Sequence, residues 1–186
     1  MKLLSLIFSL LICTVNAPAQ KGIEILPKGK EQIYKAEFNL TGTTMNGFLA
    51  VHHRRNHTLH VSFTSPMGNN LLEMRWRNGH WKKIHAIKEL GGRRTFEMMA
   101  EDILLLFAHY QFDRGFEDLG SEWKWGKKKL LPEFSDGSLV SVKVVTKRHR
   151  PTKTVKYEFG EKGIDEMSIN HQGFPFSIAL EPIRKK

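Results

Sequence analysis

Cysteine is almost absent from this sequence, since Cys13 is the only one among its 186 residues. A disulfide within the chain needs two cysteines, so none can form. Cys13 lies in the first nineteen residues, which we expect to be removed, and the mature chain then has no thiol for catalysis or metal binding. The fold must therefore rest on an apolar core, which 40% hydrophobic residues can supply at this length.

Long apolar runs are also missing, because no run reaches the ~20 residues that a membrane-spanning helix needs. The strongest run, residues 3–12, follows Lys2 and precedes Ala17-Pro18-Ala19. A basic start, a short apolar run and a small-x-small site are the three parts of a secretory signal. We therefore expect residues 1–19 to be a cleaved signal peptide and residues 20–186 to form a single exported domain in the periplasm.

Cys13 offers an alternative to cleavage after Ala19. The signal of a bacterial lipoprotein places a small residue directly before the cysteine that becomes acylated. Here that position is Ile12, whose bulk argues against lipidation. A lipid anchor at Cys13 is therefore the alternative to release into the periplasm.

Acidic residues are scarce relative to basic ones, with 19 Asp and Glu against 29 Lys and Arg and a net charge of +10. The first nineteen residues contain only one charge, Lys2, so the mature chain stays basic. Export makes nucleic acid an unsuitable partner. The charge favours an anionic membrane surface or an acidic partner protein instead. The basic pairs, such as Lys82-Lys83, lie beside expected turns, where they also serve solubility and protect sheet edges.

Signatures of catalysis are absent as well. The sequence has no Gly-x-Ser-x-Gly elbow, no His-Glu-x-x-His, no phosphate-binding loop and no Gly-x-Gly-x-x-Gly. Of the nine histidines, His52, His57 and His60 gather around one expected hairpin. A metal site needs three or four converging ligands, and neither cysteine nor a well-placed acid joins them. We expect no catalytic residue, metal or cofactor, with a hydrolase that uses this histidine cluster as the alternative.

Alternating apolar and polar residues, interrupted by turn signals, are the most prominent pattern that is present. Asn78-Gly79 is typical of a type I′ hairpin turn, and Pro175 indicates an edge strand or a bulge. The pattern predicts strands at residues 33–42, 45–53, 57–65, 71–77, 80–87, 123–125, 139–145, 154–159, 164–171 and 174–180. Residues 111–121 are expected to form a loop.

One apolar helix is expected in the middle of the chain, after Gly91-Gly92. Thr95 is its predicted N-cap, and Glu97, Glu101 and Asp102 are placed where the helix dipole favours acids. Apolar residues recur at helical spacing from Phe96 to Tyr110. Short connections between the strands predict a mainly β fold in which the helix covers a curved antiparallel sheet, an incomplete β-barrel. A β-sandwich is the alternative.

Apolar residues on one face of the sheet and on the helix are expected to face each other. A hydrophobic cavity between them would be lined by Phe38, Leu40, Leu59, Val61, Phe63, Leu72, Met74, Trp76, Phe96, Met99, Ile103 and Phe107. Methionine packs adaptably against flexible apolar partners, which favours a binding site. The alternative is a scaffold protein in which the same residues form a fully packed core.

These elements resemble the lipoprotein-carrier (LolA/LolB-like) family, in particular its divergent members in Bacteroidetes-type bacteria. The resemblance is carried by residues 38–42, 47–51, 61–63, Gly68, 72–74 and the helix 96–106. It implies an incomplete β-barrel whose helices cover a hydrophobic cavity, in a protein that is not an enzyme. The family uses this cavity to carry the acyl chains of lipoproteins between membranes, as part of outer membrane biogenesis. The resemblance therefore implies a periplasmic carrier of a lipid or a lipidated protein.

Overall fold

The computed structural model describes residues 31–53, 58–107, 116–118, 122–125, 127–136, 138–146, 150–161 and 163–184. Within residues 116–118 it describes the backbone alone. The expected signal peptide lies outside the described residues, as do Cys13, His57 and Tyr110.

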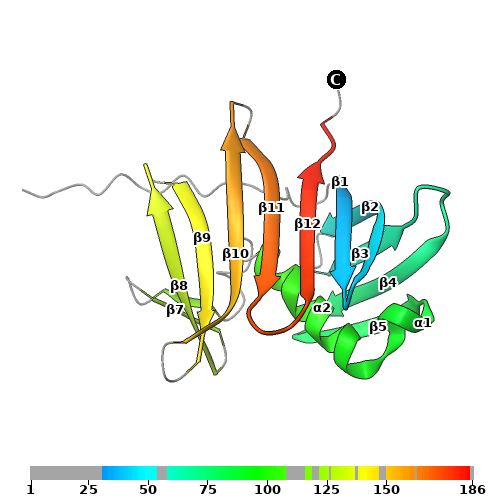
Figure 1. The fold of residues 1–186 in the computed structure, drawn as a ribbon, viewed down its shortest axis with the longest axis horizontal. Helices are drawn as coiled ribbons and strands as arrows, with labels where there is room; N and C mark the ends of the chain where they lie inside the picture. Colours follow the sequence, from blue (N-terminus) through cyan, green and yellow to red (C-terminus); the bar gives the residue numbers. More distant parts are fainter. Residues whose placement is uncertain are drawn as a thin grey trace, which may run out of the picture.

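Twelve strands form one antiparallel sheet in the described part of the chain (Figure 1). They are β1 (Glu31–Leu40), β2 (Thr43–His53), β3 (Leu59–Thr64), β4 (Asn70–Arg77), β5 (His80–Ala86), β6 (Phe116–Asp118), β7 (Trp123–Trp125), β8 (Lys128–Ser135), β9 (Ser138–Val145), β10 (Pro151–Gly160), β11 (Gly163–His171) and β12 (Phe176–Pro182). Their order in the sheet is β5-β4-β3-β2-β1-β12-β11-β10-β9-β8-β7-β6. The last strand thus pairs with the first, and the two halves of the chain become one continuous sheet.

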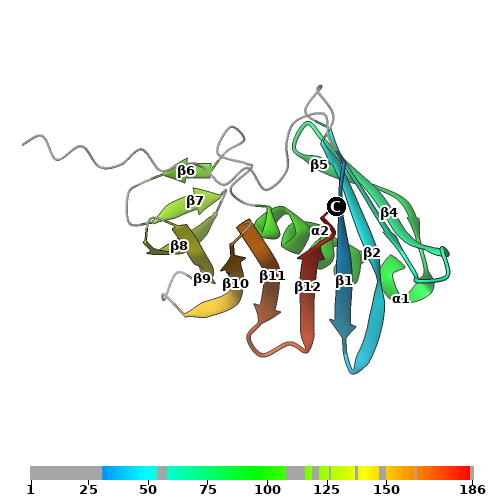
Figure 2. The same ribbon diagram turned by 90° about the horizontal axis from the view of Figure 1, so that it is seen from above.

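The sheet is strongly curved and open, because its edge strands β5 and β6 do not pair with each other. Helix α2 (Arg93–Leu106) lies inside the bend, with β1–β5 on one side and β8–β12 on the other (Figure 2). The predicted fold class, an incomplete β-barrel with a mid-chain helix, is confirmed. A single sheet also replaces the two packed sheets of the β-sandwich alternative.

The helical segment differs from the prediction at its start. A four-residue helix, α1 (Lys88–Gly91), precedes α2 and is too short to leave a periodic pattern in the sequence. Gly92 occupies the N-cap of α2 without a side-chain hydrogen bond, so the N-cap prediction for Thr95 is wrong. Because α2 begins at Arg93, its first turn contains no acidic residue, and the expected complement to the helix dipole is also absent there.

Two strands, β6 and β8, were not predicted. β8 contains Pro132, which lacks the backbone donor that a ladder needs. Among the described residues, β7 pairs only with residues 128–130 of β8, so no described strand takes a hydrogen bond from Pro132 on that side. Pro175 was expected to mark an edge strand or a bulge. The strand after it, β12, lies between β1 and β11 in the sheet, so the edge-strand prediction is wrong. Pro175 immediately precedes β12 and so removes no hydrogen bond from the ladder.

The core fills the bend between the sheet and α2. Inward side chains of nearly every strand are buried, and so is the C-terminal half of α2. The rings of Tyr34 and Phe107 meet edge to face with centroids 5.6 Å apart. The hydroxyl of Tyr157 donates to the carbonyl oxygens of Leu105 and Leu106, at 3.3 and 3.2 Å. These contacts attach the end of α2 to β10, and burial raises the pKa of this phenol.

Neither of the helices described here combines the length and the hydropathy that a membrane span requires.

Candidate functional site

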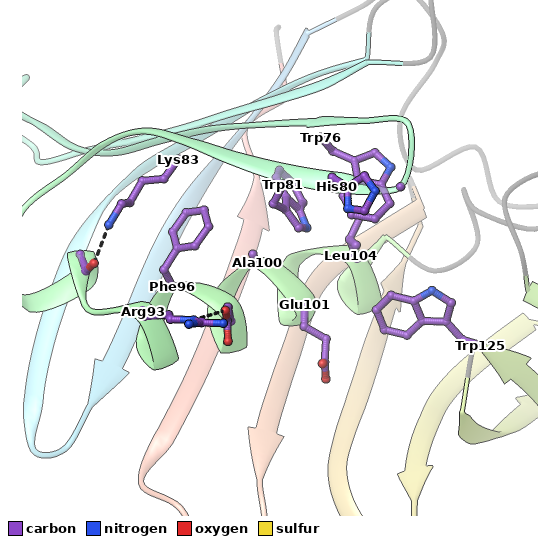
Figure 3. A pocket seen from close by; sticks show the side chains of 13 residues that line it. Trp76, His80, Trp81, Lys83, Arg93, Phe96, Ala100, Glu101, Leu104 and Trp125 are labelled. Atoms are coloured by element: carbon purple, nitrogen blue, oxygen red, sulfur yellow. Dashed lines mark hydrogen bonds and ion pairs between the residues drawn. The ribbon is translucent and has the colours of Figure 1, made fainter.

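A cavity of about 630 Å³ lies between the β4–β5 hairpin and α2 (Figure 3). Its volume falls in the range of about 300–1,000 Å³ that is typical of small-molecule sites. The apolar part of its lining consists of Trp76, Trp81, Phe96, Ala100, Leu104 and Trp125. The polar part consists of His80, Lys83, Arg93, Glu97 and Glu101, with Gly79 and Gly91.

The hairpin wall follows from the turn that the sequence predicts. Asn78 and Gly79 both have positive φ angles, 51° and 82°, as a type I′ turn requires. Such a turn makes Trp76 and Trp81 direct cross-strand partners, so both side chains lie on the same face of the hairpin. Their rings are tilted at 57° with centroids 5.4 Å apart. The indole N–H of Trp81 is buried and finds no acceptor among the described residues.

The helix wall consists of Phe96, Ala100 and Leu104, which lie four residues apart and so share one face of α2. Figure 3 shows these three residues below the hairpin, with Trp125 of β7 at one end of the space. Aromatic and aliphatic surfaces therefore face each other across the cavity, as a site for an apolar ligand requires.

Charged groups surround the mouth of this apolar space. The Lys83 ammonium donates a hydrogen bond to the Gly91 carbonyl, at 2.6 Å, and lies 5.7 Å from the centre of the Phe96 ring. Arg93 Nε donates to Glu97 Oε1 at 2.9 Å, one helical turn away. Both Lys83 and Arg93 are exposed. The cavity thus has an apolar interior and a rim on which cations are available to a ligand's head group.

A network of buried ions fixes another side of α2 to the far half of the sheet. Asp102 has no exposed surface, and its two carboxylate oxygens accept from Lys153 Nζ and His171 Nε2, each at 2.6 Å. Lys153 also contacts Glu101 at 2.6 Å, and Lys128 pairs with Glu101 as well. β8, β10 and β11 each contribute one of these partners. The helix is therefore fixed on the side of β8–β11, and the cavity lies between the helix and the β4–β5 hairpin.

Glu101 makes this network sensitive to pH. Burial alone would raise the pKa of its carboxyl group, but the hydrogen bonds and charges of Lys128 and Lys153 outweigh burial and lower the pKa below its ordinary 4.5. A carboxyl group with a lowered pKa in the folded state stabilises the protein above its unfolded pKa. This contribution is lost as the pH falls through the folded value.

We therefore expect Glu101→Gln to lower the free energy of unfolding by about 1–2 kcal/mol at neutral pH. The difference from the wild type should shrink as the pH falls below the unfolded-state pKa of about 4.5 and then through the lower folded-state pKa of Glu101. Urea denaturation followed by tryptophan fluorescence, at intervals from neutral to acid pH, measures both quantities. A constant offset between the two proteins over this whole range would contradict the role given to Glu101.

The predicted cavity residues are found in three kinds of position. Trp76 and Phe96 line the cavity. Leu40 is half-buried against the core. The others, Phe38, Leu59, Val61, Phe63, Leu72, Met74, Met99, Ile103 and Phe107, are buried in the core that fills the bend.

The side chains of His52 and His60, on β2 and β3, lie on the outer face of the sheet. His52 and His60 are direct cross-strand partners, and His60 Nε2 lies 3.1 Å from Glu73 Oε1. His57 is outside the described residues. No group of three or more histidine, cysteine or acidic side chains in the described ranges is arranged to hold a metal ion.

Several lining residues were not predicted, although the sequence contained a signal for one of them. In the hairpin predicted around Asn78-Gly79, the residue opposite Trp76 is Trp81. The pairing of these two residues in the predicted hairpin would have been enough to include Trp81 among the predicted cavity residues. Ala100 and Leu104 gave no such signal, because helical spacing shows that a residue faces inward but not what it faces. Trp125 comes from a strand far along the chain, which no local pattern connects to the helix.

No protein-family model matches this chain, and no curated protein does. Among the solved structures that resemble it are the following three. A LolA superfamily protein from Nitrosomonas europaea has a TM-score of 0.46 at 11% identity, over 89% of this chain and 90% of that one. A DUF1329 family protein from Desulfovibrio piger has a TM-score of 0.42 at 8% identity, over 84% and 85%.

An outer membrane lipoprotein-sorting protein domain from Vibrio parahaemolyticus has a TM-score of 0.37 at 10% identity, over 83% of each chain. Overlaps of this size describe a remote likeness of fold and assign no ligand to this chain. The resemblance to lipoprotein carriers that the sequence implies therefore remains an expectation.

Proposed function

We propose that this protein is a non-enzymatic periplasmic carrier of a lipid or of the acyl chain of a lipidated protein. The observation that carries the proposal is the cavity of about 630 Å³ between the β4–β5 hairpin and α2, with Trp76, Trp81 and Phe96 on its walls. An acyl chain is a ligand that such a site can take without any specific polar contact, because burial of apolar surface is non-directional.

The expected affinity suits a carrier. Burial of about ten methylene groups contributes roughly 8 kcal/mol, which corresponds to a micromolar dissociation constant before the entropy of binding is subtracted. A carrier must release its ligand as well as bind it, and a dissociation constant of micromolar or weaker allows release.

The polar groups at the cavity support a ligand with an oxygen-rich head. Lys83 and Arg93 at the rim suit a carboxylate or a phosphate. A lipid contains such a group together with its apolar chain.

Native mass spectrometry of the protein released gently from the cell envelope tests the proposal. We expect mass additions that correspond to acyl-containing molecules and that disappear after extraction with organic solvent. The extracted protein should then rebind an added fatty acid with a stoichiometry of one. A protein that carries no adduct and rebinds none would instead be a scaffold with a packed interior.

A further inference from the structure

A row of basic side chains crosses the outer face of β2–β5. His52, His60, Arg75 and Lys82 are successive direct partners across these four strands. Direct partners project from the same face of a sheet, and neighbouring strands are about 4.8 Å apart. The four side chains therefore form one continuous row on the side of the sheet away from the core.

The cations at the β5 end of this row are not explained by the fold. Arg75 lies directly opposite Lys82, and like charges in this position destabilise a sheet. Arg77, two residues further along β4, is exposed. Among the described residues, none of these three cations forms an ion pair, whereas His60 contacts Glu73. Their positive charge is free to meet an anionic partner.

The same hairpin carries the cavity on its other face. Arg75 and Lys82 project outward next to Trp76 and Trp81, which project inward to the cavity. Gly79 at the end of the hairpin also lines the cavity. A surface that attracts these cations would hold the hairpin in contact with that surface. The cavity wall, which the same hairpin forms, would then lie close to the surface as well.

A second group of acidic side chains lies on β10 and β11, away from the β4–β5 hairpin. Glu158 of β10 is the direct partner of Glu166 of β11. Burial, together with the negative charges of Glu158, Glu181 and Glu37, raises the pKa of Glu166. An anionic surface would repel this region and attract β2–β5, and the protein would approach it in one orientation.

We propose that the outer face of the β4–β5 hairpin, through Arg75, Arg77 and Lys82, docks on the surface of an anionic lipid bilayer. The inference rests on the proposed function, because docking places the cavity wall where an acyl ligand is collected or delivered. A bilayer fits better than an acidic peptide, because its charge is spread over a plane and needs no groove to be recognised.

Co-sedimentation with phosphatidylcholine vesicles, prepared with and without phosphatidylglycerol, tests the docking. The wild-type protein should bind the anionic vesicles and not the neutral ones, and binding should be lost between about 0.1 M and about 1 M salt. Arg75→Gln/Lys82→Gln should weaken the partition about 30-fold, since each cation near an anionic membrane contributes about one kcal/mol. Lys127→Gln/Lys156→Gln removes the same charge from exposed positions outside the hairpin and should bind like the wild type.

Three results would overturn the inference. The first is equal binding of the wild-type protein to both kinds of vesicle, and the second is an equal loss of vesicle binding in the two double variants. The third is no vesicle binding at all, together with dimers that are sensitive to salt and that only Arg75→Gln/Lys82→Gln abolishes. The last result would identify the acidic region of a second copy as the partner.

Fatty-acid binding by Arg75→Gln/Lys82→Gln, measured in parallel, separates docking from the proposed function. The cavity should bind normally in this variant, and loss of fatty-acid binding in every protein would instead remove the carrier proposal.

Discussion

Replacing Asp102 with alanine is expected to lower the free energy of unfolding by about 3–5 kcal/mol, the effect of breaking a buried ion pair. Asp102 is fully buried and accepts hydrogen bonds from Lys153 and His171, whose side chains are only 13% and 7% exposed. Without the carboxylate, the buried His171 loses this acceptor, and Lys153 loses one of its two carboxylate partners and keeps Glu101. For a protein of this size we expect a fall in Tm of about 10 °C.

Asp165→Ala is the matched control for Asp102→Ala. Asp165 is also an aspartate in an ion pair, with Arg184 at 2.6 Å, but the two side chains are 55% and 40% exposed. Exposed pairs contribute at most about 1 kcal/mol. Thermal unfolding followed by circular dichroism compares the two variants. If Asp102→Ala were no less stable than Asp165→Ala, the ion network would not be what fixes α2 to β8–β11.

Replacing Trp81 with glutamate is expected to weaken the binding of a fluorescent fatty acid by roughly 30- to 100-fold. Trp81 faces Trp76 on the wall of the cavity, and the new carboxylate would have to lose water whenever an acyl chain entered. Leaving a polar group without water or a partner costs at least about 2–3 kcal/mol, which gives this change in the dissociation constant. Fluorescence titration of the solvent-extracted protein measures it.

Ile84→Glu provides the control for Trp81→Glu. Ile84 is on the same strand, is 46% exposed and does not line the cavity, so the same charge is added at a site the ligand does not reach. We expect the Ile84→Glu protein to bind like the wild type, and both variants to keep the wild-type circular dichroism spectrum. An equal loss of binding in the two variants would place the ligand outside this cavity.

The fold was predictable because its signals are local. Alternation from Tyr34 onward and the helical spacing of Phe96 to Phe107 each reflect which side of an element faces the core. The curvature of the sheet followed from short connections between strands. β8 was missed because Lys128, Lys129 and Pro132 hide its alternation, and its pairing with β7 involves only residues 128–130 among the described residues.

The cavity was only partly predictable, for a reason of geometry. Period-two alternation places Phe63 and Trp76 on the same inner face without distinguishing them. Whether an inward residue is packed or faces open space depends on the distance from its strand to α2, which the curvature of the whole sheet sets. Trp76 is on β4, next to β5 at the edge of the described sheet, whereas Phe63 is fully buried.

The role of Asp102 was not predictable from its neighbours. The sequence pattern assigns it to the helix dipole, but its partners Lys153 and His171 are 51 and 69 residues away along the chain. They reach it only because β10 and β11 return to the side of α2. Contacts at this separation require the topology of the sheet, which no local pattern encodes.

Covalent labelling with a photoactivatable fatty acid tests the central claim most directly, because it records where the acyl chain lies. After irradiation and proteolysis, tandem mass spectrometry should find the label on peptides that contain residues 76–83 and 96–104, with excess oleate suppressing it. Labels confined to the outer face of the sheet, or spread evenly over the chain, would contradict an acyl-binding cavity between the β4–β5 hairpin and α2.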